Sequence, residues 1–501
     1  MADASSSSPA TTPRVTANRS AIPTDGEFRE YISGGWAERP DVTPSPRVAA
    51  AHAATRRARI SAQYPGTRLI VPAGPARVRS NDTDHPYRAH SAFAYLTGWG
   101  SDAVPDSVLV FEPTADGHDA TLYFLAAAGR DTTEFYANAG IGEFWTGPRP
   151  SLAHVAADLG LPTRDLAQLE VVLELVDAST VIVRDADSAL TDQVDGRRLL
   201  SAELDPETMD VDDEADSTFA SDLSEMRFVK DDWELAELRA AIAATKRGFD
   251  EVIADLPAAI ATERGERVVE GTFDRRARID GNTVGYDTIA ASGPHACYLH
   301  WTRNDGPVVP GDLLLMDAGV ELDSLYTADI TRTLPVSGRF TDIQRKIYDA
   351  VLEAADAARA IVRPGIRFRE IHAEAMRVVA EKTAEWGLLP GTAEDSLDGG
   401  QWHRRYMIHG TSHHLGLDVH DCAKARRELY LDGVLEPGMV FTIEPGLYFQ
   451  SDDLTVPEEY RGIGVRIEDN VVVTADGCDL LSGDIPRTAD AVEEWMSSLL
   501  P

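Results

Sequence analysis

The sequence predicts an α+β protein, in which a duplicated C-terminal domain follows a smaller, mixed α/β N-terminal domain. The first observation is a repeated motif: segments 310–319 and 437–446 both read Pro-Gly, five residues, an acid, one residue and Gly. An apolar, partly β-branched run precedes the acid in both copies, which is typical of a buried strand. The second observation is that two helical segments precede each copy. The third is that helical and strand-like stretches alternate over residues 46–206.

Length, composition and charge exclude several classes of protein. A chain of 501 residues is long enough for two or three domains. Its 47 Lys and Arg residues and 83 Asp and Glu residues give a net charge of −36. This charge disfavours nucleic acid or an anionic membrane as a partner. The short basic run 56–59 does not change that conclusion, because we interpret it as a solvated helix face.

Cysteine usage and hydropathy predict a cytoplasmic protein. The three cysteines are widely spaced and odd in number, so neither a disulfide framework nor a zinc finger is predicted. No stretch approaches the roughly 18 apolar residues of a membrane-spanning helix. The first residues, MADASSSSPATTPR, lack the apolar core of a signal peptide.

The first 46 residues differ in composition from the rest of the chain. They are rich in Ser, Thr, Ala and Pro, which is typical of disorder. Phe28, Tyr31 and Trp36 interrupt this polarity. We therefore expect residues 1–46 to form an N-terminal extension that is disordered or docks as a short segment on the body of the protein.

An acidic stretch separates the two predicted domains. Residues 203–216 carry eight acids in fourteen positions, which predicts an exposed connection. We therefore place an N-terminal domain at 47–225 and a C-terminal domain at 226–501. In the first of these we expect helices at 47–63, 152–159 and 166–175, and strands at 69–71, 108–111, 121–125 and 181–183.

The C-terminal domain is predicted to consist of two similar halves. Amphipathic helices at 231–254 and 268–279 precede the first acid motif. In the second half, Thr341-Asp-Ile-Gln reads as a capping box that starts a helix, and a further helix at 368–386 ends before Gly387. The repeated order of helices, strands and acids indicates that the two halves meet at their carboxylates.

Each half supplies a pair of acids from neighbouring strands. Asp317 and Glu444 are the acids of the repeated motif, and the strand-like segments that follow contain Asp329 and Glu468. Four carboxylates inside apolar strands are costly unless a positive charge neutralises them. Two divalent cations would balance that charge. The alternative interpretation is that these acids are hairpin and turn residues with unrelated partners.

Histidines provide a second signal for a metal site. The segment 406–421, YMIHGTSHHLGLDVHD, contains four histidines within twelve residues, and His300 precedes the first acid motif. Carboxylates with one or two imidazoles form a hard ligand set, which favours Mn²⁺ or Co²⁺ over a thiolate-type zinc site. Two metals about 3.5–4 Å apart would hold a hydroxide aimed at a carbonyl or phosphoryl centre.

Five motifs in this order resemble those of a known family. MDAG, ADITRT, HGTSHHLGLDVHD, TIEPGLY and GVRIED are similar to the motifs of the "pita-bread" metallopeptidases, and most closely to the aminopeptidase P family. HPYRAHSAFAYLTGW, at 85–99, resembles the signature of that family's N-terminal domain. The resemblance implies a catalytic pita-bread domain preceded by an aminopeptidase-P-like domain.

The resemblance also implies a set of metal ligands. Asp317 would bind one metal ion, and Asp329 and Glu468 would bridge both ions. His413 and Glu444 would bind the second ion. The implied cofactor is a pair of divalent ions, of which Mn²⁺ is favoured and Co²⁺ and Zn²⁺ are alternatives. The loop from Asp317 to Asp329 is one residue longer than is common in the family, and we expect it to bulge at the hairpin tip without moving the ligands.

Further residues match catalytic positions of the family. His300 and His420 would bind the substrate carbonyl or stabilise the tetrahedral intermediate. His409 matches another catalytic-pocket histidine, and Glu444 would shuttle a proton. His414 lies where the family varies, so we interpret it as a packing residue.

Four other residues match substrate-binding positions. Tyr448 and Arg466 would form hydrogen bonds near the metals. Asp82 and Trp145 match positions of the N-terminal domain that reach a neighbouring subunit's active site in tetrameric relatives. The resemblance therefore implies a homo-oligomer, either a dimer or a tetramer.

The implied activity is that of a metal-dependent exopeptidase acting on peptide substrates. A hydroxide that bridges two metal ions would release the N-terminal residue from peptides with proline at the second position. One alternative is a prolidase, which cleaves Xaa-Pro dipeptides. The other is a catalytically inactive pita-bread binding module, which the intact ligand set disfavours.

Overall fold

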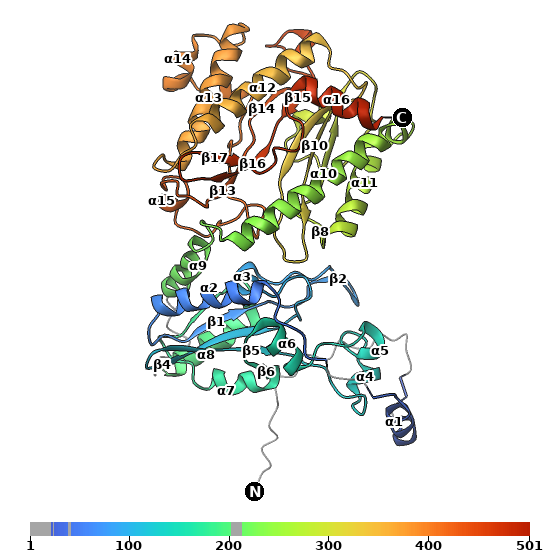
Figure 1. The fold of residues 1–501 in the computed structure, drawn as a ribbon, viewed down its shortest axis with the longest axis vertical. Helices are drawn as coiled ribbons and strands as arrows, with labels where there is room; N and C mark the ends of the chain where they lie inside the picture. Colours follow the sequence, from blue (N-terminus) through green and yellow to red (C-terminus); the bar gives the residue numbers. More distant parts are fainter. Residues whose placement is uncertain (1–21, 24, 39–41, 202–212, 501) are drawn as a thin grey trace. The chain divides into compact units, whose positions relative to one another are not determined.

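The computed structural model describes residues 22–23, 25–38, 42–201 and 213–500. The chain divides into two compact units, residues 1–219 and 220–501 (Figure 1). Most of the predicted disorder in residues 1–46 lies outside the described residues. Where the structure describes the chain, no helix is long and apolar enough to cross a membrane.

The first unit is built on a mixed five-stranded sheet, which matches the predicted α/β class. The strands of the whole unit are β1 (Leu69–Pro72), β2 (Val78–Ser80), β3 (Thr83–Asp84), β4 (Val108–Thr114), β5 (Gly117–Phe124), β6 (Thr163–Asp165) and β7 (Val181–Ile182). The five-stranded sheet has the order β6-β5-β4-β1-β7, and β2 and β3 form a separate hairpin. The β1–β4 and β4–β5 pairs are antiparallel, and the β1–β7 and β5–β6 pairs are parallel.

The helices of the first unit include counterparts of the three predicted ones, at 47–63, 152–159 and 166–175, together with others that the sequence patterns do not predict. They are α1 (Gly26–Ser33), α2 (Ala49–Gln63), α3 (Ser91–Thr97), α4 (Glu134–Ala137), α5 (Glu143–Thr146), α6 (Leu152–Leu159), α7 (Leu169–Leu173) and α8 (Ser188–Ser201). The patterns do not predict α8. Its buried face contains Thr191 and Arg198 beside Leu190 and Val194, so its hydrophobic periodicity is weak.

The basic run in α2 is a correction to the sequence analysis. Arg56 and Arg57 are buried, not solvated. Arg56 donates a hydrogen bond to the carbonyl of Tyr95, and Arg57 donates one to the carbonyl of Leu96. Both acceptors lie in the last turn of α3, where unpaired carbonyls and the negative end of the helix dipole favour cations.

Aromatic residues near the N-terminus pack against the first unit. The ring of Phe28 meets Tyr136 edge-on with ring centroids 5.3 Å apart, and Trp36 meets Phe135 in the same way at 5.6 Å. Tyr31 is 81% exposed.

The end of the acidic stretch is a second correction. Residues 202–212 lie outside the described residues, but Asp216 belongs to helix α9 (Glu214–Glu225) and is 1% exposed. Its carboxylate accepts hydrogen bonds from Arg184 and Arg198 and from the backbone N–H of Ile182. An acid in a charged run is buried here because two arginines neutralise it.

The second unit contains two helix pairs and a C-terminal helix. The helices are α10 (Asp232–Ile260), α11 (Gly265–Asp280), α12 (Asp342–Ala360), α13 (Phe368–Glu385), α14 (Ala393–Asp395), α15 (Arg427–Tyr430) and α16 (Ala489–Leu499). Helix α10 packs against α11, and α12 packs against α13 (Figure 1). The predicted capping box at the start of α12 is confirmed, because Thr341 and Gln344 bond to each other's backbone N–H.

The strands of the second unit confirm the predicted duplication. They are β8 (Thr283–Val284), β9 (Ile289–Ser292), β10 (Leu313–Ala318), β11 (Val320–Glu321), β12 (Ile330–Pro335), β13 (Val440–Ile443), β14 (Gly446–Phe449), β15 (Ile463–Arg466), β16 (Asp469–Val473) and β17 (Cys478–Leu480). One sheet has the order β12-β10-β9 and another has the order β13-β16-β17. Strand β10 pairs with β12 antiparallel, as its counterpart β13 pairs with β16.

Polar contacts as well as apolar packing join the two halves. Arg332, on β12, is fully buried and forms an ion pair with Asp469 of β16 at 2.8 Å. The thiol of Cys297 donates to the backbone carbonyl of Phe449 at 3.3 Å. Because each half supplies one partner of these contacts, the halves form a single structural unit.

The glycines of the repeated motif have identifiable structural reasons. Gly311 and Gly438 follow the prolines and have φ angles of +101° and +91°, which L side chains rarely adopt. The later glycine, Gly319, allows close approach of the backbone: a Cβ placed there would lie 1.7 Å from the carbonyl oxygen of Ala328. The motif therefore specifies a turn, a strand and a close backbone crossing next to the acid.

Gly319→Ala should lower the free energy of unfolding by about 1–3 kcal/mol, since the added methyl group must displace backbone. Gly271→Ala is a matched control on α11, where a Cβ would meet nothing within 4 Å. We expect it to be neutral or to stabilise by up to about 1 kcal/mol. Chemical denaturation measures both values, and equal effects would contradict the close-approach argument.

Candidate metal centre

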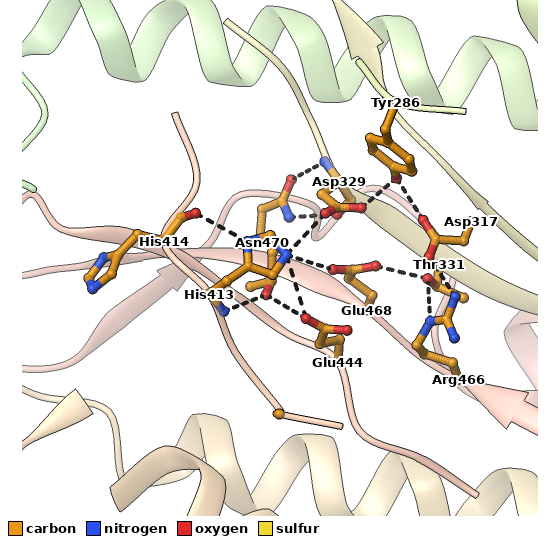
Figure 2. Close-up of polar contacts among 12 residues, drawn as sticks. Tyr286, Asp317, Asp329, Thr331, His413, His414, Glu444, Arg466, Glu468 and Asn470 are labelled. Atoms are coloured by element: carbon orange, nitrogen blue, oxygen red, sulfur yellow. Dashed lines mark hydrogen bonds and ion pairs between the residues drawn. The ribbon is translucent and has the colours of Figure 1, made fainter. Parts of the chain in front are cut away.

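The five predicted metal ligands line one cavity of about 500 Å³ in the second unit. Asp317 lies near the end of β10, and Asp329 immediately precedes β12. Glu468 immediately precedes β16, and Glu444 follows β13. Figure 2 shows these side chains gathered in one region, where His413 lies among Asp329, Glu444 and Glu468, and Asp317 faces Tyr286 and Arg466.

Two groups neutralise part of the charge on the first pair of acids. The hydroxyl of Tyr286 donates to Asp317 at 2.7 Å and also to Asp329 (Figure 2). Arg466 donates from Nη2 to the other carboxylate oxygen of Asp317 at 2.5 Å. Burial, followed by the nearby charge of Asp317, raises the pKa of Tyr286 well above its ordinary value, so this hydroxyl keeps its proton.

The His413 imidazole lies among three carboxylates. Its Nε2 atom is 3.2 Å from Asp329 Oδ2, 3.5 Å from Glu444 Oε1 and 3.9 Å from Glu468 Oε1. Its other ring nitrogen, Nδ1, lies 3.1 Å from the carbonyl oxygen of His414. Because a carbonyl only accepts, Nδ1 carries the proton and Nε2 is oriented toward the carboxylates, as in many metal-ligating histidines.

The halves exchange supporting contacts at Asp329 and Glu468, the two acids that are predicted to bridge the metals. Thr331, two residues after Asp329, donates its hydroxyl to Glu468 at 2.8 Å. Asn470, two residues after Glu468, donates its side-chain amide to the backbone carbonyl of Asp329 at 2.6 Å. Residues two apart in a strand share a face, so each of these two acids is followed by a residue that supports the other acid.

The side chains fit a divalent cation. Asp329, His413 and Glu468 each offer one ligand atom, and these three atoms lie within 4.8 Å of one another. Glu468 Oε1 is buried and has no hydrogen-bond partner among the described residues. A carboxylate oxygen in that position needs a positive partner, and oxygen and imidazole ligands suit Mn²⁺, Co²⁺ or Zn²⁺.

The electrostatics of the metal-free chain reflect crowding of like charges. Burial raises the pKa of Glu444 from its usual value to about 7, although the charge of His413 opposes the shift. Burial and then the charge of Asp329 raise the pKa of Glu468 well above its usual value. Burial likewise raises the pKa of Asp317 despite the charge of Arg466. Each shift means that the ionised carboxylate is destabilised here.

One acid and one base form an ion pair within this group. Burial acts to raise the pKa of Asp329, but its hydrogen bond to His413 and the charge of that ring lower it overall. Burial acts to lower the pKa of His413, but Asp329 and Glu444 raise it to about 9. The imidazolium therefore occupies part of the position that a cation would take.

The other predicted histidines line the same cavity. His300, His409 and His420 are all in its wall. The ring of His420 meets that of His413 edge-on, with centroids 4.4 Å apart, and burial followed by the charge of His413 lowers the pKa of His420. The cavity therefore presents a neutral imidazole beside the cluster of acids.

His409 belongs to a hydrogen-bonded chain. Its Nε2 lies 2.8 Å from the hydroxyl of Tyr448, which accepts a hydrogen bond from Arg466 at 3.1 Å. Burial and then the charge of Arg466 lower the pKa of His409 to about 3. Tyr448 and Arg466 thus connect this imidazole to Asp317.

The profile described as "Metallopeptidase family M24" matches residues 236–475, and the profile "Aminopeptidase P, N-terminal domain" matches residues 53–183. The chain is 51% identical to Xaa-Pro aminopeptidase 1 of Streptomyces coelicolor over 477 residues, which cover 94% of this chain and 92% of that protein. The chain belongs to the aminopeptidase P family of metallopeptidases. It is therefore a metal-dependent aminopeptidase.

More distant members of the family and solved structures agree. Xaa-Pro aminopeptidase of Escherichia coli is 34% identical over 455 residues, covering 88% of this chain and 96% of that protein. The structure of aminopeptidase PepP of Pseudomonas aeruginosa matches with a TM-score of 0.76 at 29% identity, covering 90% of this chain and 99% of that one. Zinc-substituted E. coli aminopeptidase P with bound product matches with a TM-score of 0.75 at 30% identity, covering 90% and 99%. The predicted family and the predicted pita-bread fold are confirmed.

Membership of the aminopeptidase P family does not establish the predicted substrate contacts of Asp82 and Trp145. Asp82 lies in the β2–β3 turn and Trp145 in α5, and both belong to the first unit. The indole N–H of Trp145 donates to the carbonyl of Tyr136 at 2.7 Å, and the side chain is 50% exposed. Their role in a neighbouring subunit's site stays a prediction.

Aromatic rings pack around the His414 side chain. It is 1% exposed and stacks on Phe368 with centroids 4.4 Å apart, and it lies beside Phe228 and Tyr430. Neither ring nitrogen has a hydrogen-bond partner within the described part of the chain. The side chain therefore fills space behind the metal centre, as the sequence analysis expected.

Several site residues are missing from the sequence analysis. Tyr286 bridges two of the acids and Asp287 lines the cavity, but a lone aromatic and a lone acid before a short strand carry little signal. Sequence reasoning could have identified Thr331 and Asn470, because each lies two positions after a predicted bridging acid. The strand period of two places such residues on the ligand's face.

Metal binding should stabilise the protein more strongly as the pH rises from 5 to 7. The pKa of Glu444 is about 7 in the folded, metal-free chain against an ordinary 4.5. The folded state therefore holds more protons than the unfolded state, and its stability falls as the pH rises through this interval. A cation binds the deprotonated acids and removes that penalty.

Thermal unfolding of chelator-treated and Mn²⁺-loaded protein at pH 5, 6 and 7 tests this expectation. The difference in Tm should increase with pH. A difference that stays constant would show that the cluster does not take up and release protons as described.

Proposed function

We propose that this chain releases the N-terminal residue from peptides with proline at the second position. The observation that carries the proposal is the convergence of Asp317, Asp329, His413, Glu444 and Glu468, from both halves of the domain, on one cavity. Relatives named Xaa-Pro aminopeptidase support the substrate class. Prolidase and an inactive binding module are not favoured by these relatives.

The proposed cofactor is a pair of divalent ions, with Mn²⁺ favoured. Asp317 would hold one ion, His413 and Glu444 the other, and Asp329 and Glu468 would bridge them. When bound, such ions lower the pKa of water toward ~7 and polarise a carbonyl. The Oε1 atom of Glu468 is buried and accepts no hydrogen bond from any residue that the structure describes, which supports its assignment as a ligand.

Side chains of the cavity supply the remaining chemistry. Glu444 accepts the proton of the attacking water and returns it to the leaving proline nitrogen, and its side chain lines the cavity where the substrate would bind. His300 and His420 donate hydrogen bonds to the substrate carbonyl as its oxygen becomes negative. His409 and Arg466 hold the Tyr448 hydroxyl at the edge of this arrangement.

The apolar part of the cavity wall accounts for a preference for proline. Ile289, Leu299 and Val419 lie in the same wall as the acids. A proline ring has apolar methylene groups and no amide N–H to satisfy, so such a surface can accept it without leaving a polar group unpaired. The free amino terminus of the substrate is drawn to the excess of carboxylates.

The proposal extends to organisation and location. It places the extension at residues 1–46, the aminopeptidase-P-like domain at 47–225 and the catalytic domain at 226–501. The enzyme is cytoplasmic and a dimer or tetramer, in which Asp82 and Trp145 contact substrate in a neighbouring subunit's site.

Purified protein loaded with Mn²⁺ should cleave an Xaa-Pro-Yaa tripeptide at least tenfold faster than an Xaa-Pro dipeptide or Met-Ala-Ser. The expected ratio follows from a pocket that accepts a tertiary amide and extends beyond it. Release of the first residue, followed by chromatography, measures the rates. Faster cleavage of the dipeptide would identify a prolidase instead, and no turnover with any metal would indicate a binding module.

Asp329→Ala and Glu468→Ala should each abolish detectable turnover and lower the content of bound metal, because each removes a proposed bridging ligand. His414→Phe is the matched control. An aromatic ring fits the cage of Phe368, Phe228 and Tyr430, so its turnover should remain within about threefold of wild type. Near-normal activity in either acid variant would contradict the two-metal assignment.

A further inference from the structure

One fully buried carboxylate outside the metal cluster has an unusual set of partners. Glu266 lies in the first turn of α11 and is 0% exposed. Its Oε1 accepts from the backbone N–H of Ser292 at 2.8 Å and from His295 Nδ1 at 2.7 Å. Its Oε2 accepts from the indole N–H of Trp301 at 2.9 Å and from the backbone N–H of Gly306 at 2.7 Å.

These four donors all come from one loop. We name residues 292–306 the His300 loop; it leaves strand β9 at Ser292 and returns to α11 at Gly306. Glu266 therefore binds the first residue of the loop, its last residue and two side chains between them. Its own backbone N–H donates to the carbonyl of Gly306 at 3.1 Å, which closes the loop a second time.

The loop places three residues in the wall of the catalytic cavity. These are Leu299, His300 and Thr302. The neighbouring Trp301 points the other way, toward Glu266, and its ring stacks on His295 with centroids 3.8 Å apart. Trp301 lies between His300 and Thr302 in a turn, in which the backbone N–H of Thr302 donates to the carbonyl of His300 at 3.0 Å. Anchoring Trp301 to Glu266 therefore restrains the turn that carries His300.

The energetics make Glu266 decisive for this geometry. A buried carboxylate is tolerated only when its lone pairs are satisfied, and hydrogen bonds to a charged group are about twice as strong as neutral ones. Each oxygen of Glu266 accepts from two donors, so both carboxylate oxygens are needed to hold the loop. An amide cannot replace it, since its NH₂ group would face two N–H donors.

We propose that Glu266 is a positioning residue of the catalytic site, which holds the His300 loop so that the His300 imidazole meets the substrate carbonyl. The inference rests on the proposed role of His300 in peptide cleavage. It adds a carboxylate that touches neither metal nor substrate but determines where a catalytic histidine lies.

Glu266→Gln tests the proposal in a double-mutant cycle with His300→Ala. In the wild-type background it should lower kcat/KM about 10- to 100-fold, the equivalent of one or two lost charge-assisted hydrogen bonds. In the His300→Ala background the same change should cost less than about threefold, because the residue being positioned is absent. Bound Mn²⁺ should stay at the wild-type level in both. Equal losses in the two backgrounds would overturn the proposal.

Two further variants keep the test independent of folding defects. Trp301→Phe retains the ring stack on His295 and removes only one donor from Glu266, so it should reduce kcat/KM about three- to tenfold and couple to His300 in the same way. Glu263→Gln, at an exposed position three residues earlier, is the control and should have no effect. Failure of Trp301→Phe to couple would overturn the proposal even if Glu266→Gln does not fold.

A readout without substrate separates this inference from the proposed function. Arg303, whose side chain is 70% exposed, lies within the loop. Trypsin should cleave after Arg303 at least fivefold faster in folded Glu266→Gln than in wild type, because the loop is released locally. If wild type fails to cleave proline peptides, the proposed function fails while this result still stands. Unchanged proteolysis together with an additive cycle would refute the role of Glu266.

Discussion

The structure of the second unit depends on one electrostatic constraint: several carboxylates must lie close together inside a protein core. Two unit charges 4 Å apart repel by about 4 kcal/mol at the effective dielectric of a protein site. His413 and Arg466 supply two positive charges and Tyr286 one hydroxyl proton. These groups satisfy Asp317 and Asp329, but one buried oxygen of Glu468 has no hydrogen-bond partner among the described residues. Divalent cations, which membership of the metallopeptidase family implies, would relieve this crowding of like charges.

In the duplicated architecture, both halves supply acids to the cavity, and each half also supplies groups that stabilise the other half's acids. Neither half could hold the site alone, because Asp329 and Glu468 are each supported by a residue of the opposite half. Thr331 contacts Glu468 and Asn470 contacts Asp329, and the buried pair of Arg332 and Asp469 fixes the strands that carry them. Removing one partner of such a buried pair leaves an uncompensated charge. The same contacts thus hold the two halves together and fix the geometry of the site.

The repeated motif and the cluster of histidines led sequence reasoning to the five side chains that line one cavity, since strand period and charge alone place acids such as Asp317 and Glu468 at buried strand ends. Other features depend on distant partners and leave no local pattern. The burial of Arg56 and Arg57 follows from the carbonyls of α3, some forty residues away. Glu266 has partners spread over fifteen positions of a loop whose closure only the folded chain defines. Periodicity indicates which side chains are buried, but it does not indicate which polar groups will meet there.

The reactivity of the Cys297 thiol can be used to probe the contact between the two halves. It is 3% exposed, burial raises its pKa to about 12, and it donates to the Phe449 carbonyl across the boundary between the halves. A thiol of that kind does not react with alkylating reagents while it is covered. The rate at which an alkylating reagent labels this thiol therefore reports how often the contact between the two halves opens locally. Such opening can be followed in the intact enzyme without substrate.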